Sequence, residues 1–140
     1  MTHEEIRDLI DRWQRALERR DKEAFASVYA DEVELQSPLA GSVSGQEGVR
    51  KTFDAFFTAF PDASVVTETP IVDGHRAAVV ASLSGTHAGD FMGLPARGKT
   101  FRFPVVFLLE FRDGQIVRDR RIYDFTGLLL QIGAIKAKPA

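Results

Sequence analysis

Few side chains in this sequence combine a reactive group with a position where it could act. The chain of 140 residues has no cysteine, which removes disulfides, thiolate metal ligands and thiol nucleophiles together. Its histidines are His3, His75 and His87, and their spacing does not form a metal-ligating cluster, so we expect no metal site. His87 ends an alternating strand on the same face as its apolar residues, so it is predicted to point inward near a pocket mouth. Histidine titrates near neutral pH, so His87 is a candidate general base; the alternative is a hydrogen-bonded residue at a loop end.

An arginine near the C-terminal end is the second candidate. The turn Asp113-Gly114 joins two predicted strands and allows two registers, a two-residue loop or a three-residue loop with a bulge. One register sends Arg120 inward and the other sends Arg121 inward, and the residues alone leave this open. A buried arginine either pairs with a carboxylate, here Asp119 or Asp90, or binds an anionic ligand.

Aromatic and hydroxyl side chains supply the remaining candidates. Trp13 lies on an apolar helical stripe, so it is predicted to pack in the core, and its N–H reaches a ligand only if a pocket extends to it. Ser37 and Tyr123 carry hydroxyls that can position a carbonyl, although neither has an acidic or basic neighbour to activate it. Asp124 precedes a helical pattern and is interpreted as an N-cap.

Periodicity predicts the elements that position these residues. One helix is expected to begin at a capping box formed by Thr2 and Glu5. A second is expected to begin after Asp21 and to include Tyr29, and a third is expected to run from a capping box at Ser44 and Glu47 to Pro61. Strands are expected at residues 33–37, 64–72, 76–87, 99–112 and 115–123, followed by a final helix that Gly133 ends. A glycine-rich loop at residues 88–98 is a predicted pocket lid, and the tail that ends at Ala140 is expected to be loose. The pattern is that of a single α+β domain over residues 1–140.

Composition excludes several classes of function. Lys and Arg number 18 against 20 Asp and Glu, so the chain lacks the basic footprint that nucleic-acid binding needs. No apolar run is long enough to span a membrane, and the polar start is not a secretory signal, so we expect a cytoplasmic protein. Glycine patterns that cradle phosphate do not occur, and no nucleotide or other cofactor is implied. A partner chain is implied, because Val106, Leu108 and Ile122 form an apolar patch on the outer sheet face, which predicts a homodimer.

Four segments together give the sequence a family resemblance. They are YADEV at residues 29–33, GQEGVR at 45–50, GTHAGDFMGLP at 85–95, and FRDGQIV at 111–117 leading into DFTGLL at 124–129. With the element order, they resemble the SnoaL-like polyketide cyclases of the nuclear-transport-factor-two-like, or ketosteroid-isomerase-like, superfamily. The resemblance implies a cystatin-like cone, an α+β barrel in which a curved antiparallel sheet wraps over three helices, often as a dimer. It also favours the register that sends Arg121 and Tyr123 inward. This fold hosts cyclases, isomerases, hydrolases, dehydratases and binding modules, so it does not fix the chemistry.

The catalytic positions that the resemblance implies hold other residues here. Arg121 and Phe107 stand where the cyclases carry an Asp and a His, and Trp13, Ser37 and Phe107 stand where the steroid isomerases carry a Tyr and two acids. An arginine stays protonated and cannot accept a proton. The first hypothesis is a cofactor-independent cyclase- or isomerase-type enzyme for a small hydrophobic molecule with a carbonyl or carboxylate. In it Arg121 stabilises negative charge and His87 moves the proton. The alternative is a protein that only binds such a molecule. The pocket residues expected in both cases are Trp13, Leu35, Ser37, Phe103, Phe107 and Tyr123.

Overall fold

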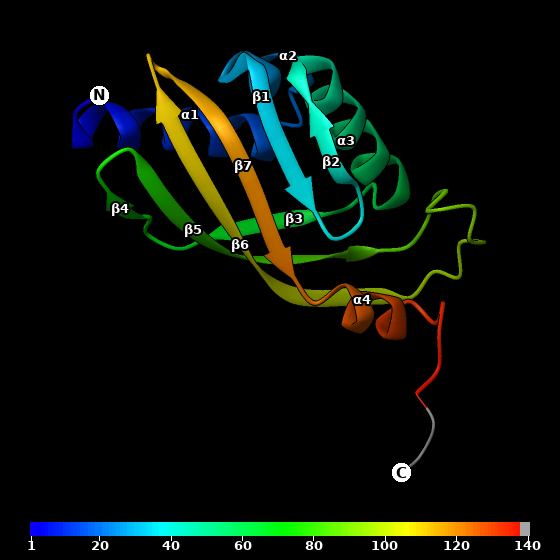
Figure 1. Cartoon of the computed structure of the whole chain (residues 1–140). Helices are drawn as coiled ribbons and strands as arrows, with labels where there is room; N and C mark the ends of the chain where they lie inside the picture. The colour runs from blue at the N-terminus through cyan, green and yellow to red at the C-terminus, as the bar shows by residue number, and fades with distance from the viewer. Residues whose placement is uncertain (138–140) are drawn as a thin grey trace.

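Four helices form where the apolar stripes and caps predict them. The computed structural model describes residues 1–137 and places α1 at His3–Arg19, α2 at Lys22–Ser27, α3 at Gly45–Ala59 and α4 at Phe125–Gln131 (Figure 1). The side-chain oxygens of Thr2, Asp21 and Asp124 each accept a hydrogen bond from a backbone N–H in the first turn of their helix. The end of the tail predicted to be loose, residues 138–140, lies outside the described residues.

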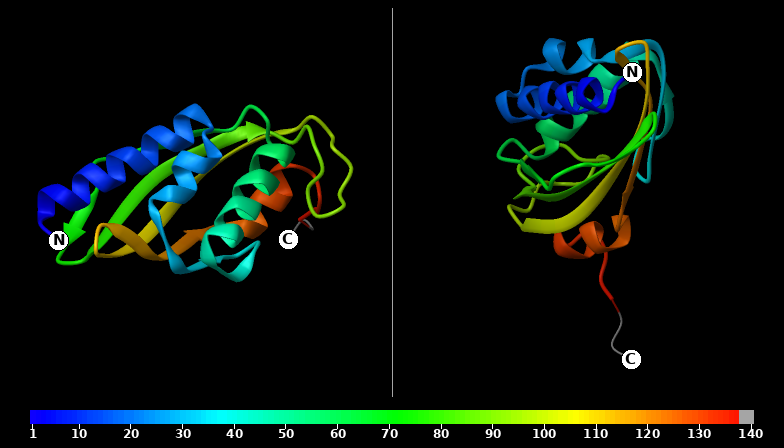
Figure 2. Two further views of the ribbon diagram at one scale, coloured as in Figure 1. Left: turned by 90° about the horizontal axis from the view of Figure 1, so that it is seen from above. Right: turned by 90° about the vertical axis from the view of Figure 1, so that its left-hand side faces the viewer.

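A seven-stranded sheet, curved and open, covers one side of α1, α2 and α3 (Figure 2). Its strands are β1 (Tyr29–Ser37), β2 (Gly41–Ser44), β3 (Ser64–Thr67), β4 (Ile71–Asp73), β5 (Arg76–Thr86), β6 (Thr100–Arg112) and β7 (Gln115–Tyr123). Their order is β2-β1-β7-β6-β5-β3, with β4 also paired to β5. All pairs are antiparallel except β1 and β7, which are parallel. The α+β architecture is the one predicted, with this parallel pair as a difference from a purely antiparallel sheet.

Three local predictions were wrong. Tyr29 begins β1 rather than continuing α2, because it pairs with Ile116 of β7 and strand pairing overrides the short helical pattern. The Ser44 hydroxyl does not cap α3; it donates to Glu34 on the neighbouring strand at 3.0 Å. The strand predicted at residues 64–72 is split into β3 and β4 around Pro70, which has no N–H to give to a ladder.

A bulge in the hairpin between β6 and β7 decides which arginine faces inward. Asp113 and Gly114 form a two-residue turn with φ of 51° and 78°, and Arg112 pairs with Gln115. That register alone would place Arg120 opposite Phe107. The register instead shifts by one residue between the Phe111–Ile116 and Glu110–Arg118 pairs, and Phe107 pairs with Arg121. A single extra residue therefore turns Arg121 toward the helices and Arg120 toward the outer face.

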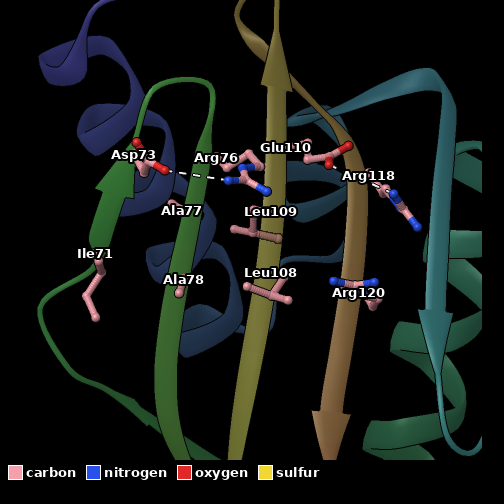
Figure 3. A pocket seen from close by; sticks show the side chains of 10 residues that line it. All are labelled: Ile71, Asp73, Arg76, Ala77, Ala78, Leu108, Leu109, Glu110, Arg118 and Arg120. Carbon is pink, nitrogen blue, oxygen red and sulfur yellow. Dashed lines mark ion pairs between the residues drawn. The ribbon is translucent and has the colours of Figure 1, made fainter.

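The outer face of the sheet carries the apolar patch predicted from Val106, Leu108 and Ile122. Ile122 is 51% exposed, while Val106 and Leu108 are half-buried. A groove of about 230 Å³ extends from β4 to β7, and Leu108 and Ala78 are among the residues that line it (Figure 3). Ion pairs of 3.5 Å between Arg76 and Asp73, and of 3.9 Å between Arg118 and Glu110, border it. The outer face thus carries an apolar patch bordered by charged side chains, including Arg120 beside Leu108.

Candidate functional site

A cavity of about 510 Å³ lies between α3 and the inner face of the sheet. Its volume falls within the usual range for small-molecule sites. Most of its wall is aromatic or aliphatic, contributed by Phe25, Phe53, Phe56, Phe57, Phe60, Leu83, Phe91, Phe103, Val105, Phe107 and Leu128. Its polar lining consists of Ser37, Lys51, Thr52, Asp54, Thr58, Asp90, Arg121 and Tyr123. A mostly apolar ligand with a few polar atoms fits this lining.

The loop at residues 88–98 forms part of the cavity wall through Asp90, Phe91 and Met92. Its first residues are fixed to the end of α3, because the N–H groups of Ala88 and Gly89 both donate to the carbonyl of Ala59 at 3.1 Å. A Cβ atom at position 89 would overlap the Thr58 carbonyl oxygen, so only glycine fits this close approach. Lid motion remains a prediction, whereas the contribution of the loop to the wall is observed.

Arg121 brings a positive charge to this apolar wall. Its side chain is only 16% exposed, and its Nη2 lies 3.1 Å from Oδ2 of Asp119. The guanidinium carbon lies 5.5 Å from the centre of the Phe107 ring, a cation–π distance. Burial disfavours the charged form and is the largest single effect, but the contributions of Asp119 and Tyr29 together outweigh it and raise the pKa of Arg121. Arg121 is therefore a fixed cation.

A buried chain of hydrogen bonds lies behind Arg121. Asp119 is fully buried, and its Oδ2 also accepts a hydrogen bond of 2.6 Å from the Tyr29 hydroxyl. The Tyr29 oxygen in turn accepts a hydrogen bond of 2.9 Å from Nε1 of Trp13. Burial, and then the charge of Asp119, raise the pKa of Tyr29, so this hydroxyl stays protonated. We call Trp13, Tyr29 and Asp119 the buried relay.

Ser37 and Tyr123 add hydroxyls to the same wall. Burial raises the pKa of Tyr123, while the nearby Leu39 backbone, the charge of Arg121 and the Ser37 side chain act in the opposite direction. The Tyr123 ring stacks on Phe103, with ring centres 5.3 Å apart. These contacts hold the Tyr123 ring against the cavity wall, on the strand that carries Arg121.

Five of the eight predicted site residues line the cavity, namely Ser37, Phe103, Phe107, Arg121 and Tyr123. Trp13 and Leu35 are 0% and 1% exposed, and neither is part of the wall, although the Trp13 ring contacts Phe107 edge-on at 4.9 Å between centres. The part of the site that sequence reasoning missed is Tyr29, because it was assigned to a helix. Asp119 was foreseen only as one of two possible partners of Arg121.

His87 does not line the cavity. It is 1% exposed and packs edge-on against Phe60 and Phe91, with ring centres 6.1 and 5.9 Å away. Within residues 1–137, neither of its ring nitrogens has a hydrogen-bond partner. Its backbone closes the base of the loop, since its N–H donates to Lys99 and its carbonyl accepts from Gly98. The structure thus places His87 behind the cavity wall.

Comparisons with known proteins decide the family. A model of the SnoaL-like polyketide cyclases matches residues 7–132. The chain belongs to this family. No curated protein matches this chain. In the part of the chain that the structure describes, no three His, Asp or Glu side chains group as metal ligands, and no helix is long and apolar enough to cross a membrane.

Solved structures share the SnoaL-like fold of this chain. IdmH of Streptomyces antibioticus, a proposed polyketide cyclase, is 26% identical with a TM-score of 0.76, and the match covers 90% of this chain and 96% of that one. A proposed SnoaL-like polyketide cyclase from Jannaschia sp. CCS1 is 25% identical with a TM-score of 0.81, covering 91% of each chain. AclR of Streptomyces galilaeus, a proposed hydroxylase, is 24% identical with a TM-score of 0.84, and the match covers 99% of this chain and 87% of that one. Structural relatives thus differ in the reaction assigned to them.

Proposed function

We propose that this SnoaL-like protein binds a small, largely apolar molecule that carries a carboxylate or an enolisable carbonyl, and that Arg121 receives its negatively charged oxygen. One observation carries the proposal: an arginine held by a buried carboxylate lies on the wall of an apolar cavity. A mostly buried cation interacts with an anionic oxygen more strongly than it would in bulk water, because the surrounding protein has a lower dielectric constant. The interaction therefore selects for ligands with such an oxygen.

The same geometry suits cofactor-independent chemistry of the cyclase or isomerase class. Removal of a proton from the carbon next to a carbonyl moves negative charge onto the carbonyl oxygen, and a preorganised cation stabilises that enolate. The proton acceptor is then a carboxylate on the cavity wall, Asp54 or Asp90, or the substrate's own basic group, because His87 does not reach the cavity. Binding without turnover is the alternative, and the position of His87 favours it.

Calorimetric titration with naphthoate and with its uncharged amide tests the binding step. Removing the cation alone would leave Asp119 buried and unpaired, so the test variant combines Arg121→Met with Asp119→Asn. A hydrogen bond to a charged group contributes about 1.5–3 kcal/mol. The variant should therefore bind naphthoate about tenfold or more weakly, because 1.4 kcal/mol is a factor of ten. Its affinity for the amide should stay near that of the parent.

Arg120→Met is the matched control, since Arg120 lies on the opposite face of β7. It should leave both affinities unchanged. Equal losses for naphthoate and amide in the double variant would contradict the role of Arg121. Deuterium exchange at the carbon next to the carbonyl of a tetralone, followed by NMR, separates the two functions. If the parent accelerates the exchange and the double variant does not, the protein is an enzyme. If the parent binds tightly but does not accelerate the exchange, it is a binding protein.

A further inference from the structure

We infer that Asp119 and Tyr29 are positioning residues that fix the guanidinium of Arg121 and thereby set the preference of the cavity for anionic ligands. The inference rests on the proposed function. Neither residue lines the cavity, and both are fully buried behind its wall. They act on a ligand only through Arg121.

The geometry of the ion pair leaves Arg121 able to bind a ligand. A structural arginine typically forms a bidentate pair, in which two N–H groups face both carboxylate oxygens. Here only Nη2 of Arg121 donates to Asp119, and its acceptor is Oδ2, the same oxygen that accepts a hydrogen bond from the Tyr29 hydroxyl. Within the described residues, Nε of Arg121 and Oδ1 of Asp119 are buried without a partner. The pair therefore anchors the guanidinium through Nη2, whereas Nη1 forms no hydrogen bond within the described residues, is not among the buried unpartnered atoms and remains for a ligand.

The buried relay fixes the direction of each hydrogen bond. Trp13 Nε1–H can only donate, so the Tyr29 oxygen accepts, and the Tyr29 O–H is left to donate to Asp119. The carboxylate oxygen then has two donors at 2.6 and 3.1 Å, from Tyr29 and Arg121. This arrangement stops Asp119 from rotating and holds the guanidinium against the Phe107 ring. Without Tyr29, the buried carboxylate would keep Arg121 as its only described partner and would draw it away from a ligand.

The competing explanation is a purely structural link between α1, β1 and β7. A structural link predicts lower stability but equal effects on charged and uncharged ligands, because the cavity would change as a whole. Positioning predicts an effect on charged ligands alone. The ratio of the two affinities therefore distinguishes the explanations.

The experiment measures naphthoate and naphthamide binding to Tyr29→Phe by calorimetry, with thermal unfolding to check the fold. This change removes the hydroxyl and keeps the aromatic ring. We expect naphthoate to bind about tenfold or more weakly and naphthamide to bind unchanged, since the lost hydrogen bond ends on the charged Asp119 carboxylate. Val33→Ala is the matched control, because Val33 lies on β1 and is fully buried. It should lower stability without changing the affinity ratio.

Parallel losses for both ligands, or unchanged naphthoate binding, would overturn the inference. Trp13→Phe removes the donor to the Tyr29 oxygen and leaves the ion pair in place, so its ratio of naphthoate to naphthamide affinity provides the answer if Tyr29→Phe does not fold. The double variant Arg121→Met with Asp119→Asn separates the two claims. If it keeps the naphthoate affinity of the parent, the proposed function fails. If it loses that affinity while Tyr29→Phe retains it, only the positioning role fails.

Discussion

Arg121 forms the salt bridge that the sequence offered as one alternative, and it also lies on the wall of the cavity. The two are compatible because Asp119 contacts a single guanidinium nitrogen. The ion pair makes the cation tolerable inside the protein, where an unpaired arginine would be costly. The same pairing keeps the charge fixed on the cavity side of β7.

His87 gives a prediction at the same scale. Within residues 1–137 its ring nitrogens have no hydrogen-bond partner, so burying them costs desolvation free energy that no hydrogen bond offsets. His87→Phe keeps the edge-on contacts with Phe60 and Phe91, and we expect the free energy of unfolding to rise by about 1 kcal/mol. Chemical denaturation measures this change. Naphthoate binding and tetralone exchange should stay as in the parent; loss of exchange in a folded variant would restore His87 as the proton carrier.

Among the elements, the loop at residues 88–98 depends on its contact with α3. Gly89→Ala places a methyl group against the Thr58 carbonyl, so the loop must move away from the cavity that Phe91 and Met92 line. We expect weaker binding of both naphthoate and naphthamide, because the loss concerns the shape of the wall and not its charge. Calorimetry with the two ligands measures it.

Gly93→Ala is the control within the same loop. A Cβ there meets no atom within 4 Å, and only the φ of +72° opposes it, a cost of about 1–2 kcal/mol. This variant should lose some stability and keep its affinities. If the two glycine variants bind equally well, the close contact at Gly89 does not shape the cavity.

For the whole molecule, the apolar outer face predicts a homodimer. Leu108 lies in the middle of that face, between Ala78 and Arg120 in the register. Leu108→Arg puts a second positive charge beside Arg120, and across a two-fold axis it would face like charges. We expect the parent to run as a dimer and the variant as a monomer in light scattering. Glu18→Arg on α1 is the control and should stay dimeric; a monomeric parent would contradict the prediction.

Local patterns in the sequence determined much of this protein. Apolar spacing and caps located the helices, alternation located β5, β6 and β7, and four segments predicted the family that residues 7–132 confirm. Ser37, Phe103 and Phe107 lie at the cavity as predicted, because alternation fixes the face of a strand once the core side is known, whereas the family resemblance predicted the inward face of Arg121 and Tyr123. Patterns of this kind depend only on neighbouring residues.

Tertiary structure alone decided the rest of the site. The bulge between β6 and β7 reverses which residues face inward, and a one-residue shift leaves no clear mark in the sequence. Tyr29 and Asp119 are 90 positions apart and meet only because β1 and β7 pair in parallel, which no local pattern encodes. His87 follows the inward face of β5, yet Phe60 and Phe91 separate it from the cavity. Facing inward is a property of a strand, whereas reaching a cavity depends on what the other elements place in between.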